Sequence, residues 1–202
     1  MLIIDIYIVA TLFFSVFFYT KRRTNAILIL VLSLAILNEV VTKIVDKSSL
    51  NMTVYTLLHN LLWYYILYIN ISQRKLVKFG ALVFISFSVM NFIFFEGIKN
   101  YNFNTFILGA FIYIAIFIYE SFYQLKRENF IFFQSNTYIL LFSPVLFFFV
   151  LSFIFGFKSQ KLAETYVFGN LKLYDFIGYF VNIIYYTLIN IYTYRERKLN
   201  HA

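Results

Sequence analysis

Seven continuous apolar runs dominate the chain, and most polar residues lie between them. The runs cover residues 2–20, 25–45, 52–71, 78–95, 104–123, 130–156 and 173–194. A membrane-spanning helix needs about 20 mostly apolar residues, which these runs approach or exceed. Transmembrane β-strands are shorter and alternate between apolar and polar positions, which these runs do not. The pattern therefore predicts an all-α membrane protein, a single domain over residues 1–202 that forms a bundle of seven transmembrane helices.

The connections between the predicted spans are short, and the longest covers residues 157–172. They leave no room for a soluble domain between spans. The first run starts at Met1 with no basic residue before it and no small-residue cleavage motif. We therefore expect a retained helix there rather than a signal peptide.

Basic residues gather on alternate connections. The first, third and fifth connections and the C-terminus would share one side of a seven-span bundle, and they carry most of the 17 Lys and Arg residues: Lys21, Arg22, Arg23, Arg74, Lys75, Lys78, Lys126, Arg127, Arg195, Arg197 and Lys198. The other side carries Lys43, Lys47, Lys99, Lys158, Lys161 and Lys172. Asp5, Asp46, Glu96, Glu164 and Asp175 fall on or near that second side. Because cytoplasmic loops are enriched in Lys and Arg, we expect the N-terminus outside and the C-terminus in the cytoplasm.

Composition and charge agree with this interpretation. The chain is 62% hydrophobic and only 13% charged, more apolar than a soluble domain of this length tolerates. The formal charge of +8 comes from short clusters at helix ends, so membrane topology explains it without nucleic acid. The absence of cysteine excludes disulfides and thiolate metal sites. The lipid bilayer is the expected partner, in a bacterial cytoplasmic (inner) membrane, and the basic face favours anionic headgroups.

Two ionisable residues lie inside predicted spans, where desolvation is costly and a functional role is the first hypothesis. Glu39 lies roughly 9 Å from the outer end of the second span, and His59 roughly 10 Å from the outer end of the third. A short loop joins these spans, which predicts antiparallel neighbours. Glu39 and His59 are therefore expected to face the interior at similar depth, where a carboxylate and an imidazole can hold or relay a proton.

Further polar residues fall in the same outer half of the bundle. Asn38 and Asn60 adjoin the two ionisable residues, and the fourth span adds Ser88 and Asn91. The last span carries a polar stripe every three or four residues: Asp175, Tyr179, Asn182, Tyr186 and Asn190. Such a stripe must face the bundle interior or water. We therefore expect an outward-facing polar cavity, floored by Trp63, Ser143 and Pro144.

A structural alternative stands beside this hypothesis. Intramembrane asparagines also serve simply as hydrogen-bonding groups between helices. Glu96, Glu120 and Asp175 lie near span ends, where a solvated or snorkelling side chain is the simpler expectation.

Three classes of function remain to be weighed. An intramembrane metal-dependent enzyme needs several ligands facing one cavity, but His59 is the only histidine inside a predicted span, so no metal, cofactor or catalytic residue is assigned. Helical transporters tend to show repeats and paired Gly or Pro interruptions, which we do not find. Small seven-helix vitamin transporters are similar in size but rich in Trp, and retinal proteins need a mid-membrane Lys that the last span lacks.

The outward polar pocket resembles the seven-helix sensing regions that precede bacterial signalling kinases. No output domain follows Lys198, so a signal would require a separate partner protein. Through Asn38–Glu39, Asn60 and Asn182, the whole chain also resembles small uncharacterised seven-helix bacterial membrane proteins. We therefore favour a sensor or small-ligand-binding membrane module. The alternative is a small solute or ion transporter, or a channel, using Glu39 and His59.

Overall fold

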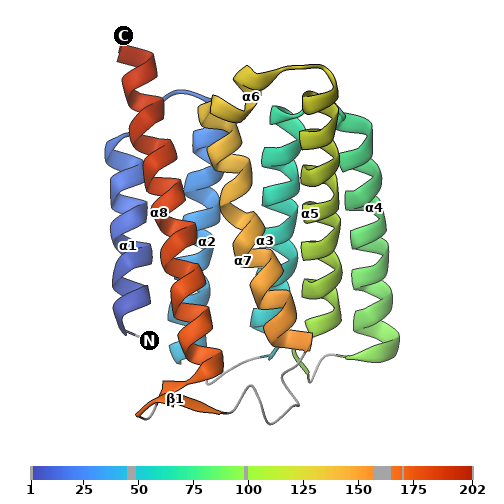
Figure 1. Ribbon diagram of the computed structural model, residues 1–202. Coiled ribbons are helices and arrows are strands. Elements are labelled where there is room, and N and C mark those ends of the chain that lie inside the picture. The colour runs from blue at the N-terminus through green and yellow to red at the C-terminus, as the bar shows by residue number, and fades with distance from the viewer. Residues whose placement is uncertain (1, 45–48, 98–99, 157–164, 170, 202) are drawn as a thin grey trace.

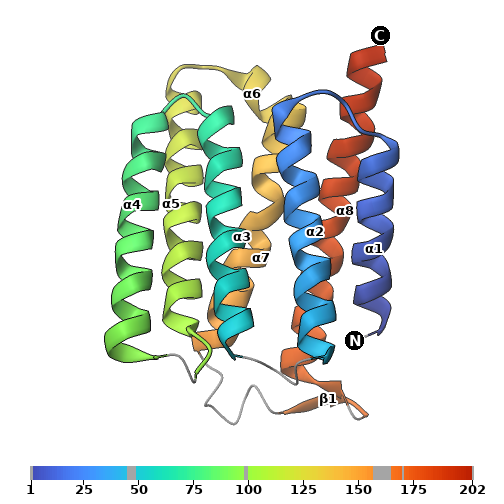
Figure 2. The ribbon, with the colours of Figure 1, turned by 180° about the vertical axis from the view of Figure 1, so that it is seen from behind.

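The computed structural model describes residues 2–44, 49–97, 100–156, 165–169 and 171–201. Within them the chain is nearly all helical, and long helices run side by side along the whole bundle (Figures 1 and 2). These are α1 (Leu2–Phe17), α2 (Arg23–Ile44), α3 (Ser49–Asn70), α4 (Arg74–Met90), α5 (Phe103–Lys126), α7 (Asn136–Gly156) and α8 (Leu173–His201). A π-helical turn, η1 (Asn91–Phe95), continues α4, and a short helix, α6 (Phe130–Gln134), precedes α7.

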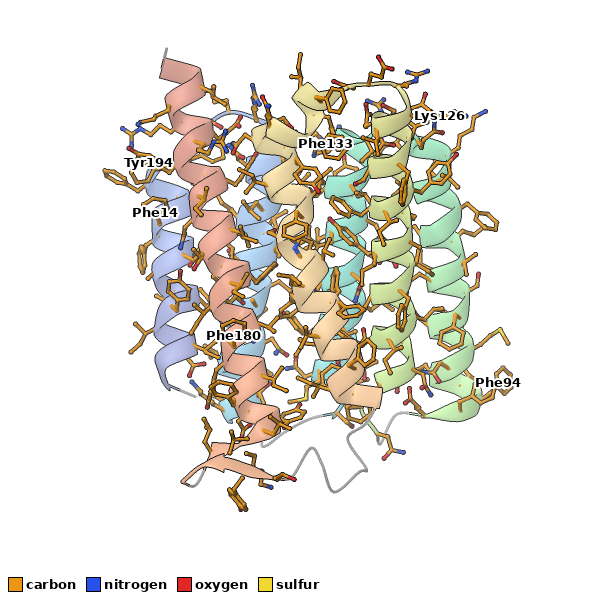
Figure 3. The ribbon with its side chains drawn as sticks, in the orientation of Figure 1. Phe14, Phe94, Lys126, Phe133, Phe180 and Tyr194 are labelled. Atoms are coloured by element: carbon orange, nitrogen blue, oxygen red, sulfur yellow. The ribbon has the colours of Figure 1, made fainter. Side chains whose placement is uncertain are left out.

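Five of the described helices are long and apolar enough to cross a membrane: α2, α4 with η1, α5, α7 and α8. Helix α1 is apolar but shorter, and α3 is long but carries more polar residues. The outer surface is covered by exposed apolar side chains, such as Phe94 and Phe180 (Figure 3). Large exposed apolar surfaces belong in lipid rather than in water. The chain is therefore an all-α, multi-pass membrane protein.

The region predicted as one span at residues 130–156 is divided into two helices. Ser135 leaves the helical conformation with ψ at 152°. Its hydroxyl accepts a hydrogen bond from the backbone N–H of Tyr138 at 3.1 Å, which is the geometry of a helix N-cap. One helix therefore ends and the next begins within a single apolar run, and hydrophobicity alone does not reveal the break.

The connection predicted at residues 157–172 holds a small hairpin in its described part. Strands β1 (Tyr166–Phe168) and β2 (Leu171–Lys172) pair antiparallel, and Gly169 between them has a φ of 56°. The predicted features at Asp46, Lys47, Lys99, Lys158, Lys161 and Glu164 lie outside the described residues.

Five helices form a closed ring: α1 packs on α2, α2 on α3, α3 on α7, α7 on α8, and α8 returns to α1. Helix α5 packs outside this ring against α3 and α7, and α4 packs against α3 and α5. In Figure 1, α8, α7 and α5 lie in front of α2 and α3, and Figure 2 shows the opposite face. The ring, and not the whole bundle, surrounds the cavity described below.

Two buried glutamates connect neighbouring segments at the end of the bundle where the C-terminus lies. Glu120 accepts hydrogen bonds from the backbone N–H groups of Ser72 and Gln73 at 3.2 and 3.4 Å, and from Gln124 at 2.6 Å. It is 1% exposed, so the expectation of a solvated or snorkelling side chain is wrong here. Glu196 forms an ion pair with Arg22 at 2.6 Å and accepts a hydrogen bond from Asn136 at 2.9 Å.

Candidate functional site

A cavity of about 490 Å³ lies inside the five-helix ring, toward the end at which the N-terminus lies. Every helix of the ring contributes to its lining: Asp5 from α1, Asn38 and Glu39 from α2, Tyr55 from α3, Phe147 and Phe155 from α7, and Tyr174, Asp175, Tyr179, Asn182 and Tyr186 from α8. This volume falls within the range of small-molecule sites in proteins. Five predicted site residues, Asn38, Glu39, Asp175, Tyr179 and Asn182, therefore share one cavity.

The acidic residues give this cavity its charge. Asp5 on α1 and Glu39 on α2 are neighbouring acidic residues in the lining. Lys43, one turn after Glu39 on α2, pairs with Asp5 at 2.5 Å. Lys43 itself is half exposed and stands at the rim, since it does not belong to the described lining. With Asp175, the described lining thus holds three acidic side chains and no basic one.

Aromatic rings form most of the remaining wall. Tyr55, Tyr174, Tyr179 and Tyr186 line the cavity together with Phe147 and Phe155. Below them, Trp63 donates a hydrogen bond from Nε1 to the Tyr185 hydroxyl at 3.0 Å, and the Tyr185 ring stacks on Phe147 at 4.8 Å. Trp63, Ser143 and Pro144, the predicted floor, do not belong to the lining. They are buried in the layer beneath it.

His59 and Glu39 do not pair directly. The His59 ring is 2% exposed and packs against Tyr55, Phe147 and Phe148 at ring distances of 5.3, 5.8 and 5.8 Å. No ion pair or hydrogen bond links it to Glu39 among the described residues. Both side chains face the interior, and Tyr55, which lines the cavity with Glu39, contacts His59 on its other side. His59 therefore supports the wall of the cavity from behind.

Asn60 and Asn91 lie away from the cavity, at contacts with α5. Asn60 donates a hydrogen bond to the Thr56 carbonyl at 2.9 Å and faces Gly109. Asn91, in η1, donates to the Thr105 hydroxyl at 2.9 Å and to Glu96 at 2.5 Å. Asn91 links η1 to α5, as the structural alternative for intramembrane asparagines expects, whereas the hydrogen bond of Asn60 stays within α3.

Within the cavity, the two other asparagines are already partly hydrogen-bonded. Asn38 accepts a hydrogen bond from Asn51 at 3.1 Å, and Asn182 donates to the Gly178 carbonyl on its own helix at 2.8 Å. These bonds engage the side-chain oxygen of Asn38 and the side-chain nitrogen of Asn182. The carboxylates and tyrosines therefore dominate the chemistry of the lining.

Sequence reasoning did not assign Asp5, Tyr55 or Lys43 to the site. Two signals point to them in retrospect. Lys43 follows Glu39 by four positions and so shares its helix face. Asp5 interrupts the first apolar run close to its outer end, at the depth at which a partner of Lys43 is needed.

The fold and this cavity together define a class: a multi-pass helical membrane protein with an interior site of acidic and aromatic side chains. No protein-family model, curated protein or solved structure matches the chain. In the described residues, no three His, Asp or Glu side chains are arranged to hold a metal ion.

Proposed function

We propose that this chain is a seven-helix protein of the bacterial cytoplasmic membrane that binds a small, positively charged organic molecule arriving from outside. It acts as a sensor or ligand-binding module and passes its signal to a separate membrane partner. In this proposal α1 and α3 span the membrane with the other five helices. Their packing along α2 supports this, as does the length of α3, about 33 Å for its 22 residues.

The direction of entry follows from charge. The cavity lies toward the end of the bundle opposite the basic connections, and positively charged loops favour the cytoplasmic side. A ligand would then enter past Lys43 and Asp175, both exposed at that end.

One observation carries the ligand class: three acidic side chains and four tyrosines line one cavity, and no basic side chain belongs to its described lining. Cations are attracted to the faces of aromatic rings, more strongly where water is excluded. An anion would meet repulsion from Glu39 and Asp175. A cationic headgroup with an apolar body matches both the charge and the aromatic wall.

The first prediction tests this ligand class with choline and its neutral isostere 3,3-dimethylbutan-1-ol, which have the same shape and differ in charge. We expect choline to raise the melting temperature of the detergent-purified protein in a concentration-dependent way, because a ligand that binds only the folded state stabilises it. The isostere should have a much smaller effect. Glu39→Gln should abolish the choline shift, since it removes a carboxylate from the cavity.

Glu128→Gln is the matched control, because Glu128 is exposed at the other end of the bundle and undergoes the same change of charge. It should leave the choline shift intact. If neither choline nor tetraethylammonium shifts the melting temperature, a cationic ligand is ruled out. A shift with the isostere alone would indicate an apolar ligand instead.

The carboxyl pair Asp5–Glu39 favours a carrier as a second candidate, because a proton shared by two carboxyl groups can be exchanged for a cationic solute. Choline uptake into reconstituted vesicles separates the two functions. Uptake driven by a pH gradient and abolished by Glu39→Gln would favour the carrier. Binding without uptake would favour the sensor.

A further inference from the structure

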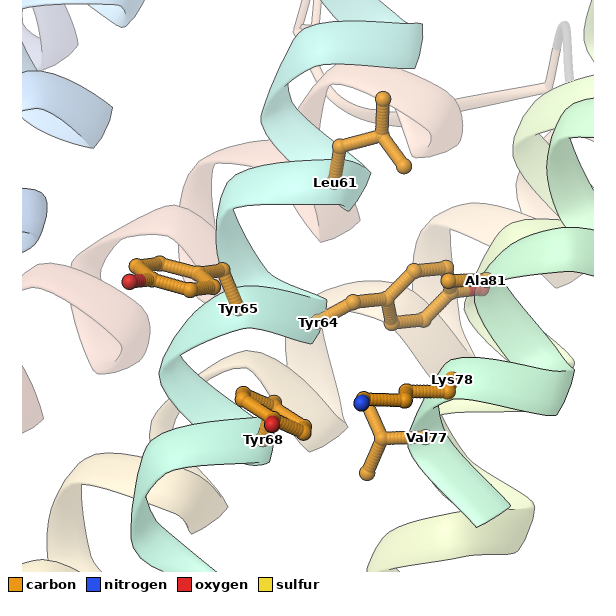
Figure 4. A pocket seen from close by; sticks show the side chains of 7 residues that line it. All are labelled: Leu61, Tyr64, Tyr65, Tyr68, Val77, Lys78 and Ala81. Carbon is orange, nitrogen blue, oxygen red and sulfur yellow. The ribbon is translucent and has the colours of Figure 1, made fainter. Parts of the chain in front are cut away.

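A second hollow lies on the outer surface of the bundle, between α3 and α4. It is a groove of about 300 Å³, with Leu61, Tyr65 and Tyr68 on one wall and Val77, Lys78 and Ala81 on the other (Figure 4). Tyr64 forms its base and is 2% exposed. Apart from the Lys78 ammonium and the tyrosine hydroxyls, the lining of the groove is apolar.

Two cations lie beside Tyr68 at one end of the groove. Lys78 Nζ lies 5.4 Å and Arg74 Cζ 5.8 Å from the Tyr68 ring centroid. Both side chains are exposed, and no carboxylate belongs to the described lining. The contact with the Tyr68 ring keeps these cations beside the groove, and their positive charge is not neutralised by it.

The groove also lies at a defined depth. Helix α3 ends at Asn70 and α4 begins at Arg74, so at 1.5 Å per residue Tyr68 lies about 3 Å and Lys78 about 6 Å from this end of the bundle. Leu61 lies about 13 Å further into the bundle than Asn70. The cations therefore stand at headgroup depth, and the apolar walls continue to the depth of acyl chains.

We infer that this groove binds one anionic phospholipid, with its phosphate between Lys78 and Arg74 and an acyl chain along Leu61, Val77 and Ala81. Charge complementarity selects the anionic headgroup, and the apolar walls select a lipid over a soluble phosphate. The site is independent of the cavity, because α4 lies outside the five-helix ring.

Native mass spectrometry of the purified protein provides the test, with phosphatidylglycerol and phosphatidylcholine of identical acyl chains offered in equal amounts. We expect a bound lipid with a clear preference for phosphatidylglycerol. Lys78→Ala should reduce that preference about fivefold, from the contribution of one cation near a lipid surface. Ala81→Leu should reduce binding of both lipids, because it fills the groove without changing charge.

Lys75→Ala is the matched control, since Lys75 lies on the same end of the same helix but does not line the groove. It should leave the preference unchanged. An equal loss with Lys75→Ala would mean a general attraction to the basic face and would overturn the site, as would an unchanged preference with Lys78→Ala. Displacement of the lipid by inorganic phosphate would also overturn it, since the headgroup alone would then account for binding.

Discussion

At the scale of single residues, Gly109 marks a close approach between α5 and its neighbours. A methyl group added there would lie 2.7 Å from Phe84 and 2.9 Å from the side-chain oxygen of Asn60. The Gly109 carbonyl also accepts a hydrogen bond from the buried Tyr64 hydroxyl at 2.7 Å. Only glycine fits at this position without moving Phe84 of α4 or Asn60 of α3.

Gly109→Ala should destabilise the protein by about 1–3 kcal/mol, the usual cost of overpacking a filled core. The measurement is thermal unfolding in detergent. Gly178→Ala is the matched control, because it is also inside a helix but an added methyl group meets no atom within 4 Å. That control should be neutral or stabilising by up to about 1 kcal/mol, through helix propensity. Equal stability of both variants would contradict the close packing of Gly109.

Glu120 gives a second prediction at this scale. It accepts three hydrogen bonds in a buried setting, two of them from the backbone before α4. Glu120→Gln replaces one acceptor oxygen by a donor that faces other donors. The expected loss of stability is about 1–3 kcal/mol. Glu128→Gln, at an exposed position in the same region of the chain, should cost far less. A comparable loss would argue against a stabilising role for the hydrogen bonds that Glu120 accepts from the α3–α4 connection.

At the scale of elements, α7 shows how a proline is accommodated inside a buried part of a helix. Pro144 has no N–H to offer the Leu140 carbonyl. The Ser143 hydroxyl donates to that carbonyl at 2.8 Å, and the Tyr113 hydroxyl donates to the next one, Leu141, at 3.0 Å. The freed backbone groups are thus satisfied by side chains, as membrane helices require.

Apolar runs predict which parts of this chain become helices, but they do not predict where helices end. The break at Ser135 depends on one hydroxyl and one ψ angle, which do not alter the hydrophobicity of the run. Similarly, the stripe on α8 predicts Asp175, Tyr179 and Asn182 on one face. It does not predict that Asn60 and Asn91 turn toward α5, because rotation of α3 and α4 about their axes depends on packing.

At the scale of the whole molecule, the proposed topology can be mapped with single cysteines, since the natural chain has none. We expect a membrane-impermeant maleimide to label one set of positions in intact cells: Ile44, Asn100 and Tyr166. A second set should be labelled only after permeabilisation: Lys21, Lys75 and Lys126. An N-terminal epitope tag, accessible in intact cells, would test whether α1 spans. Labelling of Ile44 and Lys75 from the same side would contradict a membrane-spanning α3.

The closure of the ring by α1 and α8 has a consequence for biosynthesis. Tyr7 and Thr187 meet through their hydroxyls at 2.8 Å, although they are separated by almost the entire chain. The ribosome therefore releases the first wall of the cavity long before the last one. During that interval Asp5 and Glu39 face an unfinished protein, and Lys43 on the adjacent helix already supplies a counter-charge for Asp5. The cavity therefore gains its last wall only after residues 174–186 of α8 have been synthesised.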